Sequence, residues 1–235
     1  MKVSIVMPVY NEFRTFSQVL EHVRRAPLPA GCVKEIIVID DGSTDGTAQM
    51  HNEPHGEVLG EITHRRISHS GKGSAIRAGI ELATGDIVLI QDGDLEYDPN
   101  DYARLLEPIV SGRADIVYGS RFLGQSAAMA LPNRIANRVL TAAANLLYRA
   151  QITDEATAYK AFRIEALRGI HLQCRRFEFC PEVTAKARRL GYRIHEVPVS
   201  YNARGIAEGK KIRARDGWEA LWTLLRYRFA PRARL

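Results

Sequence analysis

The feature that most constrains this chain is a series of short apolar strands, each followed by a segment with helical spacing. Residues 35–40 read EIIVID, and residues 86–91 read DIVLIQ. Such runs are apolar on both faces, which is typical of strands in a parallel sheet that helices cover on both sides. The repeated strand-helix order therefore predicts an α/β fold with a mostly parallel sheet and right-handed crossovers.

The pattern divides the whole chain into elements. The predicted strands are residues 3–7, 35–40, 57–64, 86–91, 115–119 and 193–199, with a short apolar and aromatic segment at 157–162. The predicted helices are residues 12–25, 74–83, 99–111, 131–149, 181–190 and 216–229. Ser43 or Thr44 is expected to cap a further helix. The pattern changes near residue 122, so we expect one compact domain with two halves, residues 1–122 and 123–235.

Composition excludes several classes of protein. The 235 residues are 46% hydrophobic and 26% charged, as in ordinary globular proteins, and suffice for a large core. The three cysteines show no CxxC spacing, which argues against a disulfide scaffold or a zinc ribbon and favours the reducing cytosol. No apolar run is long enough to span a bilayer. The N-terminal apolar run stops at Pro8, which predicts a strand and not a signal peptide.

The net charge of +6 belongs to one part of the chain. From Ala203 onward there are nine basic and three acidic residues, so the rest of the chain is neutral. A segregated basic segment is either a solvated surface or a site for an anionic partner such as phosphate or lipid headgroups. Nucleic acid is disfavoured, because the acidic motifs described next repel its phosphates.

Three polar motifs follow predicted strands. Residues 7–12 read MPVYNE, residues 38–47 read VIDDGSTDGT and residues 91–96 read QDGDLE. Asp-Gly pairs are also common turn residues. However, ligands of open α/β sheets bind outside the carboxyl ends of the strands. Three such motifs at successive strand ends therefore indicate a shared binding site.

Asp92 and Asp94 predict a divalent metal site. Two carboxylates on one tight loop repel each other unless a cation lies between them. Oxygen ligands suit Mg²⁺ or Mn²⁺, and such an ion would take its other ligands from a diphosphate and offset the charge of the leaving group. Glu96, two residues further on, is a third candidate ligand.

The segment Gly71-Lys72-Gly73-Ser74 opens a predicted helix. It is shorter than a P-loop, and no GxGxxG follows the first strand, so a P-loop NTPase is excluded and a dinucleotide-dependent oxidoreductase is disfavoured. The lysine and the backbone amides are candidates for contact with a phosphate or nucleotide. A plain helix start is the alternative. His69 either lies near the nucleotide or faces solvent.

Together, MPVYNE, VIDDGSTDGT, GKG and QDGDLEYDP resemble family 2 glycosyltransferases of the GT-A fold. GSRF at 119–122, TDEAT at 153–157, FEF at 177–179 and EVPVSY at 196–201 resemble the dolichol-phosphate mannosyltransferase-like group, whose members transfer sugars to polyprenyl phosphates. The motifs cover nearly the whole chain. The resemblance implies a Rossmann-like, mostly parallel GT-A sheet flanked by helices, with a C-terminal amphipathic helix. It does not specify the sugar.

The resemblance also implies roles for single residues. The residues expected to bind the nucleotide-sugar are Pro8, Tyr10, Glu12, Asp40, Asp41, Lys72, Asp92, Gly93, Asp94, Arg204, Lys210 and Lys211. The expected metal ligands are Asp92, Asp94 and Glu96, and the expected catalytic residues are Asp94, Arg121 and Asp154. Arg121 and Arg134 are expected to face the acceptor phosphate.

The implied reaction is metal-dependent, inverting transfer of a sugar from GDP-mannose or a UDP-hexose to dolichyl or undecaprenyl phosphate. A phosphate oxygen is already anionic at pH 7 and needs orientation more than deprotonation. A soluble or saccharide hydroxyl acceptor would need a carboxylate base, for which Asp154 and Glu155 are the candidates. A sugar-phosphate nucleotidyltransferase is a further alternative, although the N-terminal glycine-rich lysine loop of that class is absent.

The final predicted helix bears on membrane contact. Trp218, Leu221, Trp222 and Leu225 recur at helical spacing, and several arginines follow. Tryptophan and arginine together favour an interfacial helix on anionic lipid, while packing of the same stripe against the sheet is the alternative. The predicted location is the cytoplasm, with peripheral contact to the cytoplasmic face of the membrane left open.

Overall fold

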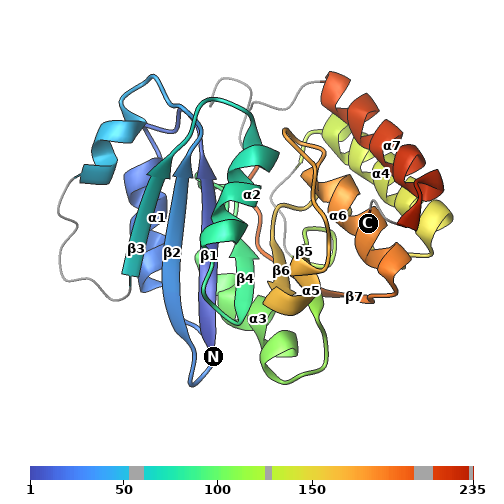
Figure 1. Ribbon diagram of the computed structural model, residues 1–235, viewed down its shortest axis with the longest axis horizontal. Coiled ribbons are helices and arrows are strands. Elements are labelled where there is room, and N and C mark those ends of the chain that lie inside the picture. Colours follow the sequence, from blue (N-terminus) through green and yellow to red (C-terminus); the bar gives the residue numbers. More distant parts are fainter. Residues whose placement is uncertain (53–60, 125–128, 204–213, 233–234) are drawn as a thin grey trace.

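The computed structural model describes residues 1–52, 61–124, 129–203, 214–232 and 235, which form one continuous seven-stranded sheet with helices around it (Figure 1). The strand order is β3-β2-β1-β4-β6-β5-β7. Six strands share one direction, and β6 runs antiparallel to its neighbours β4 and β5. The predicted mostly parallel α/β sheet is confirmed.

The elements follow the predicted order closely. The strands are β1 (Lys2–Val9), β2 (Val33–Asp40), β3 (Glu61–Arg66), β4 (Ile87–Ile90), β5 (Ile116–Ser120), β6 (Lys160–Arg163) and β7 (Ile194–Pro198). The α-helices are α1 (Phe16–Arg25), α2 (Lys72–Leu82), α3 (Tyr102–Val110), α4 (Leu131–Tyr148), α5 (Ile164–Arg168), α6 (Phe179–Leu190) and α7 (Ala214–Phe229). Two 3₁₀ turns, η1 (Thr47–Asn52) and η2 (Pro99–Asp101), complete the described elements.

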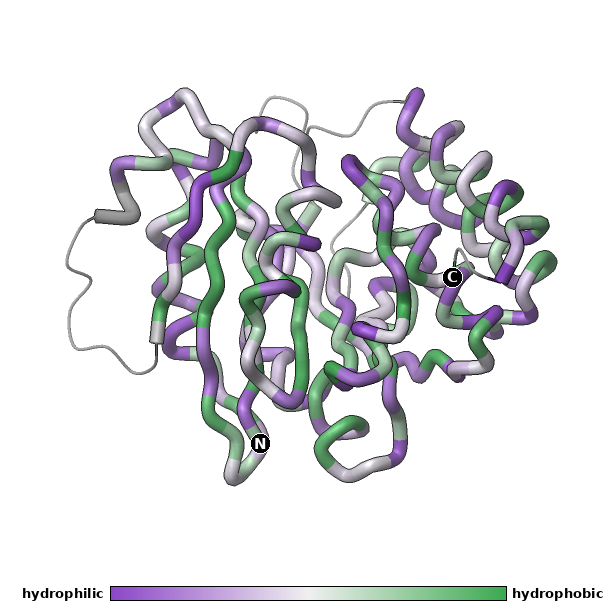
Figure 2. Tube along the Cα trace, in the orientation of Figure 1, coloured by the Kyte–Doolittle hydropathy of each residue, from purple (hydrophilic) through white to green (hydrophobic). Residues whose placement is uncertain are grey.

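Two hydrophobic clusters lie on opposite faces of the sheet. Alternate strand residues point to opposite sides, so Ile5 and Met7 pack with α1 and α3, while Val6 packs with α2 and α6. The central strands are accordingly apolar along their length (Figure 2). This double coverage explains why the strands are apolar on both faces.

Two local features go beyond or against the prediction. The predicted apolar and aromatic segment at 157–162 is present, and its second half begins β6, which pairs antiparallel inside the sheet. The α-helix expected after Ser43 or Thr44 is absent, and η1 stands in its place. Ser43 Oγ accepts a hydrogen bond from the amide of Asn11 at 2.9 Å, and the Thr44 amide donates to Asn11 Oδ1 at 2.8 Å. These two residues therefore join the ends of β1 and β2 and do not cap a helix.

Helices α4, α6 and α7 form a separate layer at one side of the molecule, where α4 and α7 lie next to each other (Figure 1). Their shared core includes Ala144, Leu224 and Tyr227. The predicted C-terminal amphipathic helix is thus present as α7. In the described part of the chain, no helix combines the length and the apolar character needed to cross a bilayer.

A buried carboxylate joins the amino-terminal ends of the first strands. Glu35 of β2 accepts hydrogen bonds from Ser4 of β1, and from the amide and hydroxyl of Thr84 at 2.8 and 2.7 Å. Lys2 Nζ lies 2.7 Å from Glu35 Oε2, the oxygen that also accepts from the Thr84 hydroxyl. Burial alone would raise the pKa of Glu35, but the hydrogen bonds from Lys2, Ser4 and Thr84 outweigh it and lower the pKa to about 2.

Candidate active site

The loop after β4 carries Asp92, Gly93 and Asp94, and a buried glutamine holds it. Gln91 Oε1 accepts hydrogen bonds from the hydroxyls of Tyr102 and Tyr159 at 2.6 and 2.7 Å. Its amide nitrogen donates to the Asp92 carbonyl oxygen at 2.9 Å. Because both ends of the Gln91 side-chain amide are hydrogen-bonded, the first residue of the carboxylate pair has a defined position.

Lys72 provides a positive charge to this loop. Its Nζ lies 2.6 Å from Asp92 Oδ1, which places the first residue of α2 against the end of β4. Burial disfavours the ammonium ion, yet the facing Asp92 carboxylate raises the pKa of Lys72 above its ordinary value. The structure therefore brings together two of the residues expected to bind the donor, and the carboxylate end of β4 attracts a cation.

The third expected metal ligand is directed elsewhere. The Glu96 amide donates to Asp94 Oδ1 at 3.0 Å, but the Glu96 carboxylate accepts a hydrogen bond from the Tyr201 hydroxyl at 3.1 Å. In the ranges that the structure describes, no three His, Cys, Asp or Glu side chains converge as a metal-binding group. Asp92 and Asp94 alone fit a Mg²⁺ or Mn²⁺ ion that takes its remaining oxygen ligands from a diphosphate.

Asp40 and Asp41, expected to bind the base, are both buried and differ in what they contact. The Asp41 carboxylate accepts hydrogen bonds from the amides of Ser70 and Gly71 at 2.7 and 2.9 Å. Asp40 Oδ1 accepts from the Ser43 amide at 3.0 Å, and its Oδ2 lies 3.5 Å from Arg66 Nε without a hydrogen bond. Asp41 thus shapes the loop before α2, and Asp40 is the one with an unused acceptor.

An aromatic pair lies beside these carboxylates. Tyr10, directly after β1, stacks on His69 with ring centroids 4.2 Å apart and an interplanar angle of 21°. His69 Nδ1 also lies 2.9 Å from Asp41 Oδ2. Glu12 accepts from the Thr15 hydroxyl at 3.1 Å, and Pro8 is buried within β1. The sequence left His69 open between two interpretations. In the structure its side chain is 56% exposed and its ring contacts Tyr10 and Asp41, so it faces solvent beside the buried carboxylates.

The start of α2 is closed to a phosphate at two of its amides. The Gly73 amide donates to the Arg176 carbonyl oxygen at 2.9 Å, and the Ser74 amide donates to that of Arg175 at 3.0 Å. A Cβ at Gly73 would lie 2.9 Å from that same Arg176 oxygen, so only glycine permits this close approach. These two amides therefore do not meet a phosphate, and a phosphate contact by the Lys72 side chain stays a prediction.

Arg121 and Asp154 form a buried ion pair across the other half of the site. Arg121 Nε and Nη2 donate to Asp154 Oδ2 and Oδ1, both at 2.7 Å, and the Arg121 amide donates to Oδ2 at 3.0 Å. Asp154 is 0% exposed and Arg121 is 6% exposed. The guanidinium also lies 5.0 Å from the ring centroid of Tyr201. Tyr201 also donates a hydrogen bond to the Glu96 carboxylate, so it connects the loop after β4 to the Arg121–Asp154 pair.

The neighbouring carboxylates support the segment that carries Asp154. Glu196 accepts hydrogen bonds from the amides of Thr153 and Asp154 at 2.7 and 3.0 Å. Glu155 is fully buried, its amide donates to Thr141 of α4, and burial raises the pKa of its carboxyl group. Glu155 thus has no solvent exposure at the site. The sequence motifs contained Glu196, Tyr201 and Gln91, but nothing local in them indicated these long-range contacts.

The remaining expected residues lie apart from this cluster. Arg134 lies on α4 with its side chain exposed. Arg204, Lys210 and Lys211 lie outside the described residues. The three cysteines, Cys32, Cys174 and Cys180, are free, and burial raises the pKa of Cys174 and Cys180, which disfavours the reactive thiolate.

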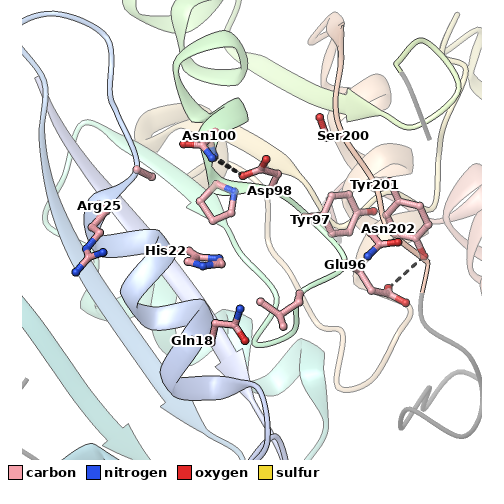
Figure 3. A pocket seen from close by; sticks show the side chains of 13 residues that line it. Gln18, His22, Arg25, Glu96, Tyr97, Asp98, Asn100, Ser200, Tyr201 and Asn202 are labelled. Carbon is pink, nitrogen blue, oxygen red and sulfur yellow. Dashed lines mark hydrogen bonds between the residues drawn. The ribbon is translucent and has the colours of Figure 1, made fainter. Parts of the chain in front are cut away.

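A cavity of about 610 Å³ opens beside Glu96 (Figure 3). Gln18, His22 and Arg25 of α1 line one wall, and the segments 95–100 and 200–202 line the other. Glu96 is the one expected site residue in its wall, with its carboxylate turned to Tyr201.

Comparison with known proteins decides the family. The model of the family described as glycosyl transferase family 2 matches residues 4–170. The chain belongs to glycosyl transferase family 2. This membership agrees with the carboxylate pair and the sheet.

The chain is similar in sequence to several curated proteins. The chain is 30% identical over 220 residues to an undecaprenyl-phosphate mannosyltransferase of Micrococcus luteus, covering 89% of this chain and 87% of that protein. It is 30% identical over 204 residues to glycosyltransferase AglJ of Haloferax volcanii (86% and 63%). It is 28% identical over 216 residues to a dolichol-phosphate mannosyltransferase of Pyrococcus furiosus (89% and 59%). The chain thus spans less than two thirds of the last two proteins.

Solved structures support the fold. Glucosyl-3-phosphoglycerate synthase from Mycobacterium tuberculosis in complex with UDP matches with a TM-score of 0.69 and 22% identity, covering 98% of this chain and 81% of that chain. Staphylococcus aureus TarS in complex with UDP matches with a TM-score of 0.61 and 17% identity (97% and 72%). The predicted GT-A arrangement is confirmed by these neighbours.

Proposed function

We propose that this glycosyltransferase moves a sugar from a nucleotide-sugar, GDP-mannose or a UDP-hexose, to a polyprenyl phosphate such as dolichyl or undecaprenyl phosphate, with inversion and with Mg²⁺ or Mn²⁺. Residues 1–122 would bind the donor and residues 123–235 the acceptor. The acceptor is a membrane lipid, so the enzyme would work as a peripheral protein at the cytoplasmic face of the membrane.

The observation that carries this proposal is the state of the two carboxylates that a hydroxyl acceptor would need as a base. Both oxygens of Asp154 are bonded to Arg121 and have no solvent exposure. Glu155 is buried beneath α4. A lipid phosphate needs no base, because its attacking oxygen is anionic at pH 7. The names of the relatives from Micrococcus luteus and Pyrococcus furiosus give the same class of acceptor.

On the donor side, Tyr10 and His69 would stack on the base, and Asp40 would accept from it with its unused oxygen. Pro8, Glu12 and Asp41 would shape the same pocket. Lys72, next to Asp92, is within reach of a diphosphate held at the end of β4. The metal, bound by Asp92 and Asp94 with Gly93 between them, would offset the charge of the departing diphosphate.

On the acceptor side, Arg121 would orient the incoming phosphate, and Asp154 would hold Arg121 in place. The acceptor oxygen forms a bond to the anomeric carbon as the bond from that carbon to the diphosphate oxygen breaks on the opposite side. Arg121 acts here by positioning an anion in a site of low water content, where an aligned charge contributes most. Arg134, Arg204, Lys210 and Lys211 would supply further positive charge to the phosphates.

The test is a panel of labelled GDP-mannose, UDP-glucose, UDP-GlcNAc and UDP-galactose, each with Mg²⁺ or Mn²⁺ and a short polyprenyl phosphate. The measurement is label in the organic phase. EDTA-sensitive label from one donor supports the proposal and identifies the sugar. Slow hydrolysis of one donor without any lipid product would contradict it and favour a soluble hydroxyl acceptor.

A further inference from the structure

Helix α4 exposes a long apolar stripe. Leu131, Ile135, Val139 and Leu146 are all exposed, and Leu146 is 83% exposed. At about 100° per residue these four side chains lie within an arc of about 80°. The buried residues of α4, such as Thr141 and Tyr148, lie on the other side of the helix.

Helix α7 repeats this arrangement with larger side chains. Trp218, Trp222, Leu225 and Phe229 lie within an arc of about 60° by the same geometry. Trp218 is 75% exposed and Phe229 is 82% exposed. Of the thirteen large apolar side chains that are exposed in the described residues, eight lie on these two neighbouring helices. Such a concentration is unusual on the surface of a soluble protein and marks an interaction site.

The charge around the two stripes is positive. Arg138 of α4 and Arg215, Arg226 and Arg228 of α7 are exposed. Helix α4 contains no acidic residue. Helix α7 contains two: Asp216 is buried and bonded to Arg176 at 3.1 Å, and Glu219 is half-buried, so the exposed arginines outnumber it. Exposed tryptophan and leucine bordered by arginine suit the boundary between anionic headgroups and acyl chains. A partner protein surface gains less from such a border, because its own charges are of both signs.

We propose that the outer faces of α4 and α7 together form a docking surface for an anionic lipid bilayer. This inference rests on the proposed lipid-linked acceptor. It assigns membrane contact to two helices that are 65 residues apart in the chain and yet pack against each other.

The inner faces of both helices hold the active site. Thr141 Oγ1 of α4 accepts from the Glu155 amide at 3.1 Å, and Asn145 pairs with the amide and carbonyl of Ile152 at 3.0 and 2.8 Å. The segment between them carries Asp154. Docking of the outer face would therefore place the Arg121–Asp154 pair at a fixed height above the bilayer, where the phosphate of a lipid acceptor lies.

The donor side of the site is also connected to one of these helices, α7. Asp216, at the start of α7, bonds Arg176, whose carbonyl oxygen accepts from the Gly73 amide beside Lys72. The acceptor half is thus joined to α4 by hydrogen bonds to residues 152 and 155, and the donor half is joined to α7 through Arg176. A bilayer on this surface would orient the donor and acceptor sites together.

The test is flotation with phosphatidylcholine vesicles, with and without phosphatidylglycerol. We expect the wild-type chain to float with the anionic vesicles. Ile135→Glu and Trp222→Glu each place a negative charge on one stripe and should lower the bound fraction about tenfold. Val33→Glu is the matched control, because Val33 is 63% exposed but begins β2, and it should float as the wild type does.

Activity separates this inference from the proposed function. Both stripe variants should transfer sugar to a short, water-soluble polyprenyl phosphate at the wild-type rate and lose transfer to a long-chain acceptor in vesicles. Transfer to the short acceptor by a wild-type chain that never binds anionic vesicles would overturn the docking surface and leave the function standing. Vesicle binding without transfer to any lipid phosphate would do the reverse. A dimer that Trp222→Glu dissociates, without vesicle binding, would assign the face to a second copy and refute the inference.

Discussion

Replacing Asp154 with alanine removes the carboxylate that holds Arg121, and we expect a loss of about 3–5 kcal/mol in the free energy of unfolding. Three hydrogen bonds end on this carboxylate, two of them at 2.7 Å from the guanidinium. Because Arg121 is 6% exposed, its charge would stay buried beside the face of Tyr201 without a carboxylate partner. Most of the loss comes from this unpaired charge, since a well-solvated ion pair contributes far less.

Thermal unfolding followed by circular dichroism is the assay. For a chain of this size, 1 kcal/mol lowers the melting temperature by about 2–4 °C, so Asp154→Ala should lower it by roughly 6–20 °C. The double variant Arg121→Met, Asp154→Leu removes both charges and should recover most of that loss, because buried ion pairs are replaced by apolar pairs at little cost. A shift below about 2 °C in Asp154→Ala, or a double variant less stable than the single one, would refute the reasoning.

Three further predictions concern the loop after β4, the lysine that faces it, and the buried Glu35 of β2. Asp94→Ala should abolish EDTA-sensitive transfer and weaken metal-dependent donor binding, as measured by titration calorimetry; full activity would contradict the metal assignment. Lys72→Met removes the ammonium ion that faces Asp92. The variant should bind Mn²⁺ several-fold more tightly in the absence of the donor, and it should bind the donor several-fold more weakly. Equal Mn²⁺ affinity of the variant and the wild type would count against the ion pair. Glu35 has a folded pKa of about 2 against an ordinary 4.5, so its contribution of about 3 kcal/mol or less is complete above pH 4.5 and is lost as the pH falls toward 2. Glu35→Gln should therefore lower the melting temperature at pH 7 and converge with the wild type near pH 2.

Much of the fold could be predicted because its signals are local. Fully apolar runs and helical spacing identify strands and helices within short windows, and parallel sheets impose both patterns. The direction of β6 could not be predicted in this way. Its four residues, Lys160–Arg163, contain two charged ends, and only pairing with β4 and β5 makes them a strand. Long-range pairing, not local propensity, determines such an element.

The site was predictable to a similar degree. Asp92 and Asp94 follow an apolar strand, so their position at the sheet edge follows from topology. The engagement of Asp41 by the loop before α2, and of Glu96 by Tyr201, depends on segments far apart in the chain. Residue type and spacing therefore indicated which groups gather at the strand ends, but not which of them keep a free oxygen for a ligand.

The role of α4 shows why such partners matter for function. Its alanine-rich sequence is equally compatible with a buried helix and a surface helix, so the pattern alone does not decide which face of α4 is buried. In the structure one side of α4 bonds the segment that carries Asp154, and the opposite side is an apolar stripe with arginines beside it. A single helix thus has one face toward the ion pair that would orient the acceptor phosphate and another toward solvent. An enzyme whose acceptor is fixed in a membrane needs this connection, because the lipid phosphate cannot move far from the surface to meet the donor.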